Sequence, residues 1–318
     1  MNDLPDLRPL ADSMRALQDA FLASIEPHRA AFWRYCYRLT GSPWDAEDLV
    51  QEALARALGR LSSVWQPTEP RAYLFRIASN TWIDGMRRAG DANRARGDID
   101  ASPDPSASDP SEPAAALEHL ASTLPRSQAV VVLLVDVFDF RLGEVAEMLN
   151  VTTNSVKGLL QRARHALSAQ RHAPEAKPVA RRVPAQNALV ASYVDAFNRR
   201  DIDALAALMH EDGVVDIVGV GENRGRKQVR ADSLPQWLVD PLPQRAEAGE
   251  FAGAPVVFVF APDEHGAEQL HRIDRQTWIE GRKILSRTYF YTPEILAMAG
   301  DALRMPAARH TFKLAEMT

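Results

Sequence analysis

The feature that most constrains this fold is a pair of apolar helix patterns joined by a short turn within residues 142–167. In the first pattern, apolar residues recur at three- and four-residue spacing from Leu142 to Leu149, which places them on one helix face. Asn150 tolerates the left-handed conformation that ends a helix, and Thr152 is a favourable N-cap for the next one. The sequence therefore predicts two helices joined by a tight turn.

The second helix of this pair divides into an apolar and a polar side. Its apolar residues, from Val156 to Leu167, form one stripe. Asn and Gln side chains can read adenine edges, whereas Lys and Arg reach guanine or phosphate, so the polar side favours entry into a DNA major groove. An ordinary helical hairpin with a basic solvated face fits the same spacing. The outward-facing residues are Asn154, Lys157, Gly158, Gln161, Arg162 and Arg164.

Composition indicates a soluble globular protein of about two or three domains. The chain has 318 residues, of which 46% are hydrophobic and 25% charged. The longest apolar run, Val130 to Val135, is too short to span a bilayer. A single cysteine, Cys36, excludes an internal disulfide and fits a reducing compartment, so we expect a cytoplasmic protein. No pattern indicates a bound metal or cofactor.

The distribution of charge is more informative than the net charge of −5. Between Asp91 and Leu120 there are seven acidic residues and two Arg. Between Lys157 and Arg182 there are seven Lys and Arg and one Glu. A local basic stripe on an acidic protein favours a DNA contact that is assisted or regulated rather than tight and autonomous.

Prolines and composition shifts divide the helical part of the chain. Residues 13–90 predict one helical block, with a break at 41–43, Asp45 as a candidate cap of the following helix, and a further helix after Pro70. Residues 91–113 contain four prolines among Asp, Ser and Ala, which predicts a flexible acidic linker. A second helical block spans 114–171, and a second linker spans 172–184.

Residues 185–318 predict a different type of domain. Two helices within 186–209 come first, and short β-like runs separated by Gly and Asp clusters follow. This pattern predicts an α+β domain that is long enough to have its own core. The predicted strands are Val214 to Val220, Pro255 to Phe260, Gln269 to Trp278, and Lys283 to Tyr291.

Four segments in a fixed order carry a family resemblance. They are YCYRLTGSPWDAEDLVQEALARAL, PRAYLFRIASNTWIDGMRR, LPRSQAVVVLLVDVFDF and LGEVAEMLNVTTNSVKGLLQRARHAL. With these segments, over roughly 18–90 and 114–170, the chain resembles the extracytoplasmic-function (ECF) sigma factors, promoter-specificity subunits of bacterial RNA polymerase. The resemblance implies sigma region 2 at 13–90, sigma region 4 at 114–171, and core polymerase and promoter DNA as partners. It implies a binding function without catalytic residues.

The resemblance also implies a role for the polar face of the second segment. In the family this helix face docks on the clamp helices of the largest polymerase subunit, although a solvated helix face has the same appearance. The candidate polymerase-binding residues are Asp45, Asp48, Gln51 and Glu52.

Two helices carry the residues that we expect to bind promoter DNA. Aromatic and basic residues alternate in PRAYLFRIASNTWIDGMRR, an arrangement that binds single-stranded DNA by stacking beside positive charge. The resemblance implies that this helix and its following loop melt the −10 element. The candidate −10 residues are Arg71, Tyr73, Arg76, Ser79, Asn80, Thr81, Trp82, Arg87 and Arg88. The candidate −35 residues are Thr153, Asn154, Ser155, Lys157 and Gln161 for base edges, with Arg162 and Arg164 for phosphates.

The C-terminal segment SYVDAFNRRDIDALAALMHEDGVVDI is similar to the start of SnoaL-like domains. In these cone-shaped α+β folds a curved sheet wraps helices around a pocket. A subset of ECF sigma factors carries such a domain in cis, and the resemblance implies a regulatory or ligand-sensing role for residues 185–318, with a small molecule as a further partner. The candidate pocket residues are His210, Asp216, Trp237, Trp278, Tyr289 and Tyr291.

Two other functions fit parts of the sequence. A one-component helix–turn–helix regulator with an effector pocket explains residues 142–167 but leaves DAEDLVQEAL and the aromatic–basic helix without a role. A SnoaL-type isomerase or cyclase fused to a DNA-binding module would need an acid–base pair, and the sequence offers none at a defensible spacing. We therefore expect a sigma factor that is regulated in cis by its C-terminal domain.

Overall fold

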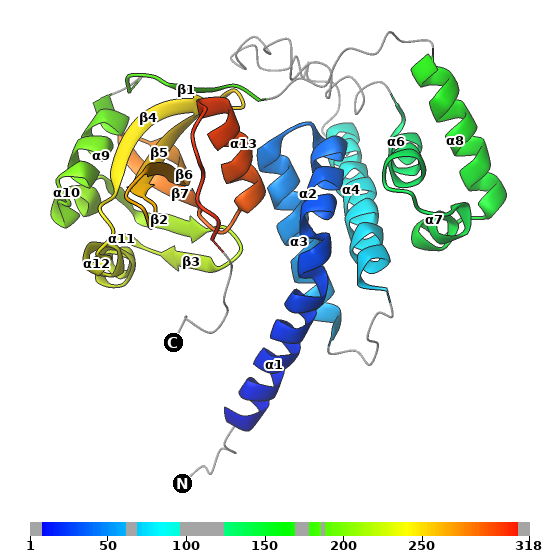
Figure 1. Cartoon of the computed structure of the whole chain (residues 1–318), viewed down its shortest axis with the longest axis horizontal. Coiled ribbons are helices and arrows are strands. Elements are labelled where there is room, and N and C mark those ends of the chain that lie inside the picture. Colours follow the sequence, from blue (N-terminus) through cyan, green and yellow to red (C-terminus); the bar gives the residue numbers. More distant parts are fainter. Residues whose placement is uncertain (1–7, 62–68, 96–123, 169–177, 186–187, 311–318) are drawn as a thin grey trace. The chain divides into compact units, whose positions relative to one another are not determined.

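The computed structural model describes residues 8–61, 69–95, 124–168, 178–185 and 188–310 (Figure 1). The chain divides into two compact units, one formed by the described residues up to 168 and the other by those from 178 to 310. The first unit consists of helices, and the second contains a mixed sheet with helices packed on it.

The first helical group surrounds α2 (Arg29–Thr40), whose apolar face is buried. α3 (Pro43–Leu61) packs on α2 and on α4 (Pro70–Ala95), and α1 (Arg8–Ile25) precedes a short 3₁₀ turn, η1 (Glu26–His28). The prediction that Asp45 caps α3 is wrong, because the helix begins two residues earlier. Ser42 Oγ accepts the Asp45 amide at 3.3 Å, and Pro43 occupies the first helical position, where its missing N–H has no cost.

The second helical group contains the predicted helix–turn–helix. α6 (Arg126–Val132) and the π-helical turn η2 (Leu133–Val137) lead into α7 (Leu142–Leu149) and α8 (Thr153–Ser168). Asn150 adopts the left-handed conformation with φ 53° and ψ 49°. Thr152 Oγ1 accepts the Ser155 amide at 3.1 Å. Both observations confirm the turn chemistry that the sequence predicted.

The second unit is built on a seven-stranded sheet in the order β1-β4-β5-β6-β7-β2-β3. Neighbouring strands are antiparallel except β2 and β7, which are parallel. The sheet curves around a core in which Tyr193 and Phe197 pack against Val257 and Val259 (Figure 1). The strands are β1 (Ala180–Arg182), β2 (Met209–Ile217), β3 (Gly221–Arg224), β4 (Arg245–Phe251), β5 (Ala254–Pro262), β6 (Glu268–Ile279) and β7 (Arg282–Tyr289).

Helices cover this sheet on two sides. α9 contacts β4 and packs with α10, whereas α13 lies against β6 and β1. Figure 1 shows α9 to α12 grouped together and α13 at the opposite end of the sheet. The helices are α9 (Ala188–Asn198), α10 (Ile202–Ala207), α11 (Arg226–Ala231), α12 (Ser233–Val239) and α13 (Pro293–Leu303).

Three strands were absent from the sequence prediction. β4 has the sequence RAEAGEF, which lacks β-branched residues, and it forms because it pairs with β1 on one side and β5 on the other. β1 lies within the predicted linker 172–184, and α4 continues to Ala95, past the predicted boundary at residue 90. β3 completes the edge beside β2.

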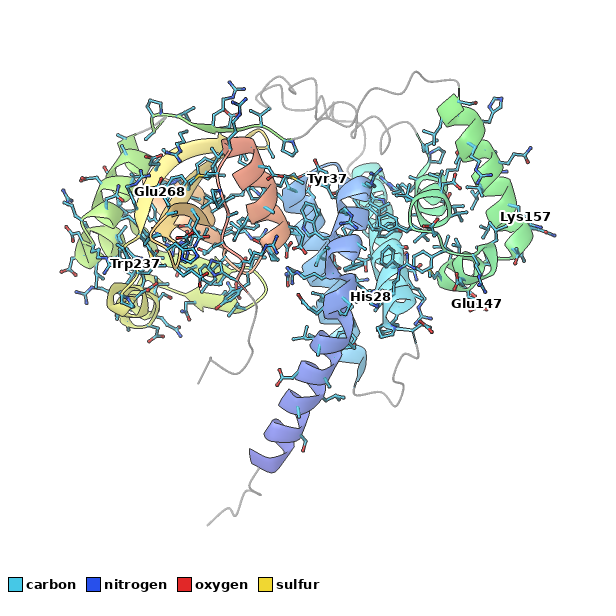
Figure 2. All side chains as sticks on the ribbon, viewed as in Figure 1. His28, Tyr37, Glu147, Lys157, Trp237 and Glu268 are labelled. Carbon is cyan, nitrogen blue, oxygen red and sulfur yellow. The ribbon has the colours of Figure 1, made fainter. Side chains whose placement is uncertain are left out.

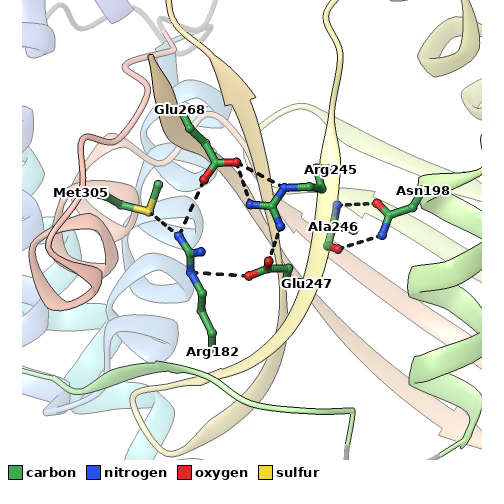
Figure 3. A network of polar contacts seen from close by, with 7 residues as sticks. All are labelled: Arg182, Asn198, Arg245, Ala246, Glu247, Glu268 and Met305. Atoms are coloured by element: carbon green, nitrogen blue, oxygen red, sulfur yellow. Dashed lines mark hydrogen bonds and ion pairs between the residues drawn. The ribbon is translucent and has the colours of Figure 1, made fainter. Parts of the chain in front are cut away.

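Side-chain interactions fix β4 to its neighbours (Figure 3). The Asn198 amide donates to the Ala246 carbonyl at 3.0 Å and accepts its amide at 2.7 Å, which ties α9 to the strand. Arg245 bonds both Glu247 and Glu268, and its contact with Glu268 is 2.6 Å. Arg182 reaches the same two carboxylates at 3.5 and 3.9 Å. Since these ion pairs are half-exposed, they set geometry more than they add stability.

We predict that Gly249→Ala destabilises the second unit, because a Cβ at this position would lie 2.2 Å from the Phe258 ring and 2.7 Å from the Arg181 carbonyl. Overpacking of this kind costs about 1–3 kcal/mol or more. Denaturant unfolding of the full chain should show an earlier transition. Gly143→Ala, where a Cβ would meet nothing within 4 Å, is the control. Equal unfolding of Gly249→Ala and the parent chain would contradict the described β1–β4 contact.

Candidate nucleic-acid interface

The exposed side of α8 gathers every candidate −35 residue. Figure 2 shows Lys157 projecting outward from this helix. Val156, Leu160 and Ala163 point the other way and are buried against the rest of the group. All seven candidates are exposed on α8, namely Thr153, Asn154, Ser155, Lys157, Gln161, Arg162 and Arg164.

One cation on this face is already paired. Arg164 makes two bonds to Asp136, at 2.6 Å from Nη2 to Oδ1 and 3.0 Å from Nε to Oδ2. The hydrogen bond and the negative charge of Asp136 both raise the pKa of Arg164. A DNA phosphate that binds Arg164 must therefore compete with a bidentate carboxylate.

The candidate −10 residues on α4 fall into exposed and buried sets. Arg76 and Asn80 are exposed, and the Arg76 guanidinium lies 5.3 Å from the centre of the Tyr73 ring. Ser79 and Thr81 are buried, at 0% and 3% exposure. The Ser79 hydroxyl lies 2.7 Å from the Tyr35 hydroxyl, so it faces the core of the first group.

Of the remaining −10 candidates, some have side chains that the structure describes and others do not. Arg71, Tyr73 and Trp82 are half-buried. Arg87 and Arg88 belong to the helical part of α4, but their side chains lie outside the described residues.

An aromatic contact joins α4 to the segment before α7. The Phe138 ring lies edge-on to Tyr35 with centroids 5.4 Å apart, and it lies 5.3 Å from the Phe75 ring. Phe140 is 5.1 Å from Phe75. We call Tyr35, Phe75, Phe138 and Phe140 the aromatic cluster. Phe138 and Phe140 are only 7% and 5% exposed, so this contact is part of the core of the unit.

Two polar residues of α4 reinforce this contact. Arg71 donates to the Phe138 carbonyl, and its guanidinium lies 4.3 Å from the centre of the Phe140 ring. The Asn80 amide donates to the Met148 carbonyl of α7 at 3.4 Å. Two candidate −10 residues therefore hold the second helical group in this structure. The sequence analysis missed Phe138 and Phe140, although two Phe flanking Asp139 were a visible signal.

The polar face of α3 adjoins one buried carboxylate, that of Glu47. Asp45, Asp48 and Glu52 are exposed, whereas Gln51 is half-buried and donates to Glu47 Oε1 at 2.6 Å. Glu47 is fully buried and also accepts from Trp33 Nε1 at 3.0 Å. The candidate polymerase-binding residues thus share one helix face, and Glu47, which sequence reasoning overlooked, orients one of them.

The second unit contains a cavity of about 130 Å³ that only partly matches the sequence candidates. Trp237 lines this cavity, whereas Trp278 lines a neighbouring one of about 110 Å³. Asp216 is paired with Arg287 at 2.9 Å, and the His210 ring accepts the Asp212 amide at 3.1 Å. These two residues and the aromatic candidates Tyr289 and Tyr291 do not line the larger cavity.

Charged residues that could not be recognised from the sequence line the cavity of about 130 Å³. They are Arg272 and Asp274 of β6 and Lys283 of β7. Asp274 is 1% exposed and Lys283 is 5% exposed. Burial lowers the pKa of Lys283 to about 8, although the negative charge of Asp274 acts in the opposite direction. A sequence alone rarely reveals such residues, because charged side chains in strands usually face water.

Within the described ranges, no cluster of His, Cys, Asp and Glu has the arrangement needed to hold a metal ion. In the same part of the chain, no helix has the length and apolar character required to cross a membrane.

Comparisons with known proteins agree with the order of these units. The family models for sigma-70 region 2, sigma-70 region 4 and a SnoaL-like domain match residues 25–91, 114–167 and 190–261. The chain is 30% identical to the ECF RNA polymerase sigma factor SigJ of Mycobacterium tuberculosis over 255 residues, 75% of this chain and 78% of SigJ. The chain belongs to the ECF sigma factors. The predicted fold class, helical sigma regions followed by an α+β SnoaL-like domain, is confirmed.

Two further comparisons are with a second sigma factor and with a solved structure. The ECF RNA polymerase sigma factor SigG of Mycobacterium tuberculosis is 34% identical over 226 residues, 61% of this chain and 60% of SigG. The chain therefore spans about 60% of the length of this relative. The crystal structure of Mycobacterium tuberculosis SigJ aligns over 87% of this chain and 99% of that one, with 21% identity and a TM-score of 0.32.

Proposed function

We propose that this chain binds core RNA polymerase and directs it to a small set of promoters. The observation that carries the proposal is the exposed side of α8, where seven residues able to contact DNA lie together within the sigma-70 region 4 match. Binding and strand separation account for such a function, so it needs no catalytic residue. The domains that we propose are 13–90 for region 2 and 114–171 for region 4, joined by 91–113.

In this proposal the recognition helix reads the −35 element. Asn154, Lys157 and Gln161 lie in its exposed first turns, where side chains come within reach of base edges. Arg162 and Arg164 bind phosphates and set the register. Since Asp136 holds Arg164 in the free chain, DNA binding exchanges a carboxylate partner for a phosphate.

In this proposal the first helical group binds the polymerase and the −10 element. The acidic face of α3, with Asp45, Asp48 and Glu52 exposed, supports docking on the polymerase clamp helices. Arg76, Tyr73 and Trp82 of α4 supply charge and aromatic faces for single-stranded DNA. Because Arg71 and Asn80 bind the second helical group, we infer that α4 releases that group before it binds the −10 strand.

We further propose that residues 185–318, connected through 172–184, regulate this activity in cis and bind a small molecule. The support is a separate core and a cavity of about 130 Å³ lined by buried charged groups. Buried charges in a cavity have a free-energy cost that a binding function can account for.

We predict that run-off transcription with purified core polymerase depends on α8 in two distinguishable ways. Gln161→Ala should change preference at one base pair by about 5- to 100-fold, because it removes a base-edge contact. Arg162→Ala should weaken binding to all promoters alike and lower the salt dependence by about one counterion. His165→Ala, at an exposed position toward the end of α8, is the control. The absence of any promoter-dependent transcript and of binding to core polymerase would contradict the proposal.

Removal of residues 177–318 should change promoter-dependent transcription, because this unit acts on the helical part through its covalent connection. The measurement compares full-length and truncated chains at matched concentrations on the same promoter. Circular dichroism of the truncated chain should retain the helical signal of the first unit. Identical transcription by both chains would exclude regulation in cis.

A further inference from the structure

The cavity of the C-terminal unit that Trp237 and Lys283 line has a size that limits its ligand. Its volume of about 130 Å³ is close to that of an engineered cavity that holds one benzene molecule, about 150 Å³. Most of its lining is apolar, with Phe197 and Leu205 on the helix side and Val215 and Ile217 from β2. A ligand that fills it is therefore a single ring, or an aliphatic group of that size, with few substituents.

The charges around the cavity leave one cation unbalanced. Arg272 Nε lies 3.3 Å from Asp274 Oδ1, and the two charges compensate each other. Lys283 Nζ lies 4.3 Å from the centre of the Tyr193 ring. Across the described ranges, no ion pair or hydrogen bond of this ammonium group is found. A buried ammonium without an anion has a free-energy cost, which is the reason for its lowered pKa.

Among the described residues of the C-terminal unit, one oxygen of the Asp274 carboxylate also lacks a hydrogen bond, although Arg272 Nε lies 3.3 Å from it. Asp274 Oδ1 is buried and, in the part of the chain that the structure describes, accepts no hydrogen bond. The neighbouring Tyr193 cannot become an anion here, because burial and the charge of Asp274 raise the pKa of its hydroxyl. Within the described ranges, the cavity thus presents a cation without an ion pair and a carboxylate oxygen that is contacted by Arg272 but accepts no hydrogen bond.

We propose that this cavity binds a small, mostly apolar carboxylate that carries a hydroxyl group, with the ligand carboxylate on Lys283 and its hydroxyl donating to Asp274. The inference rests on the ligand-sensing role proposed above for the C-terminal unit. The ion pair compensates the charge of the buried ammonium, and the hydroxyl gives Asp274 Oδ1 a hydrogen bond. The apolar lining accommodates the ring or branched chain of the ligand.

The ionisation of Lys283 makes binding dependent on pH. The charged groups that face it are Asp274 and Arg272 from β6, and Tyr193 faces it from α9. The residues that α10, β2, α11 and α12 contribute to the lining are uncharged. With a pKa of about 8, Lys283 is mostly protonated at pH 7 and loses its proton as the pH rises further. A bound carboxylate stabilises the ammonium, so affinity falls above about pH 8 and binding there is accompanied by proton uptake.

Titration calorimetry of the full chain with 3-hydroxybenzoate tests the proposal. The neutral 3-hydroxybenzyl alcohol should bind about tenfold or more weakly because it lacks the anion, and benzoate should bind more weakly because it lacks the donor. Above pH 8, buffers of different ionisation enthalpy should reveal proton uptake. Trp237, which lines the cavity, gives an independent fluorescence signal.

Two variants complete this test. Lys283→Met replaces the ammonium with an apolar side chain of similar length. This variant should lose both the preference for the anion and the pH dependence. Lys227→Met removes an exposed lysine from α11 and should change neither. If Lys283→Met fails to fold, the comparison of the three compounds on the parent chain still decides. Equal affinity for the acid and the alcohol, or no binding of either, would overturn the proposal.

Failure of this inference and failure of regulation in cis give different results. Calorimetry is performed without polymerase, so absent binding contradicts only the ligand chemistry. A chain that binds 3-hydroxybenzoate as described, but transcribes identically without residues 177–318, would contradict only the regulatory role.

Discussion

The aromatic cluster of Tyr35, Phe75, Phe138 and Phe140 is the interaction on which the helical unit depends. Its ring centroids lie 4.8 to 5.4 Å apart, within the range of favourable aromatic pairs. Through this cluster α4 anchors the second helical group, and the same helix carries the candidate −10 residues. Both tasks cannot be performed at once by Arg71 and Asn80. Separation of the two groups is therefore the conformational step that the proposed function requires.

Local chemistry explains which features could be predicted from the sequence. The turn between α7 and α8 depends on Asn150 and Thr152 alone, so its prediction is confirmed by the backbone angles and the cap hydrogen bond. The exposed side of α8 follows from helix periodicity in the same way. Long-range packing explains the rest. Ser79 is buried because Tyr35 of α2 reaches it, and β4 is a strand because two partners flank it.

The C-terminal unit shows the same limit for its site. Aromatic residues and a His–Asp pair are the usual signs of a pocket, yet the cavity is lined by Asp274 and Lys283, whose burial arises only when β6 and β7 pack under α9. A buried lysine whose pKa is lowered to about 8 destabilises the folded chain fully below that pH, and the effect declines as the pH rises toward the ordinary pKa of lysine. An anion that binds in the cavity and pairs with Lys283 would stabilise the folded unit. The stability of this unit therefore depends on whether the cavity is occupied.

A distance measurement between the two helical groups tests their separation most directly. Spin labels on cysteines introduced at Ala30 of α2 and Ser168 of α8, both exposed, report their separation. Cys36 does not interfere, because it is buried and burial raises its pKa. We predict one distance distribution in the free chain and a longer one in the complex with core polymerase and promoter DNA. An unchanged distribution in a complex that transcribes would contradict it.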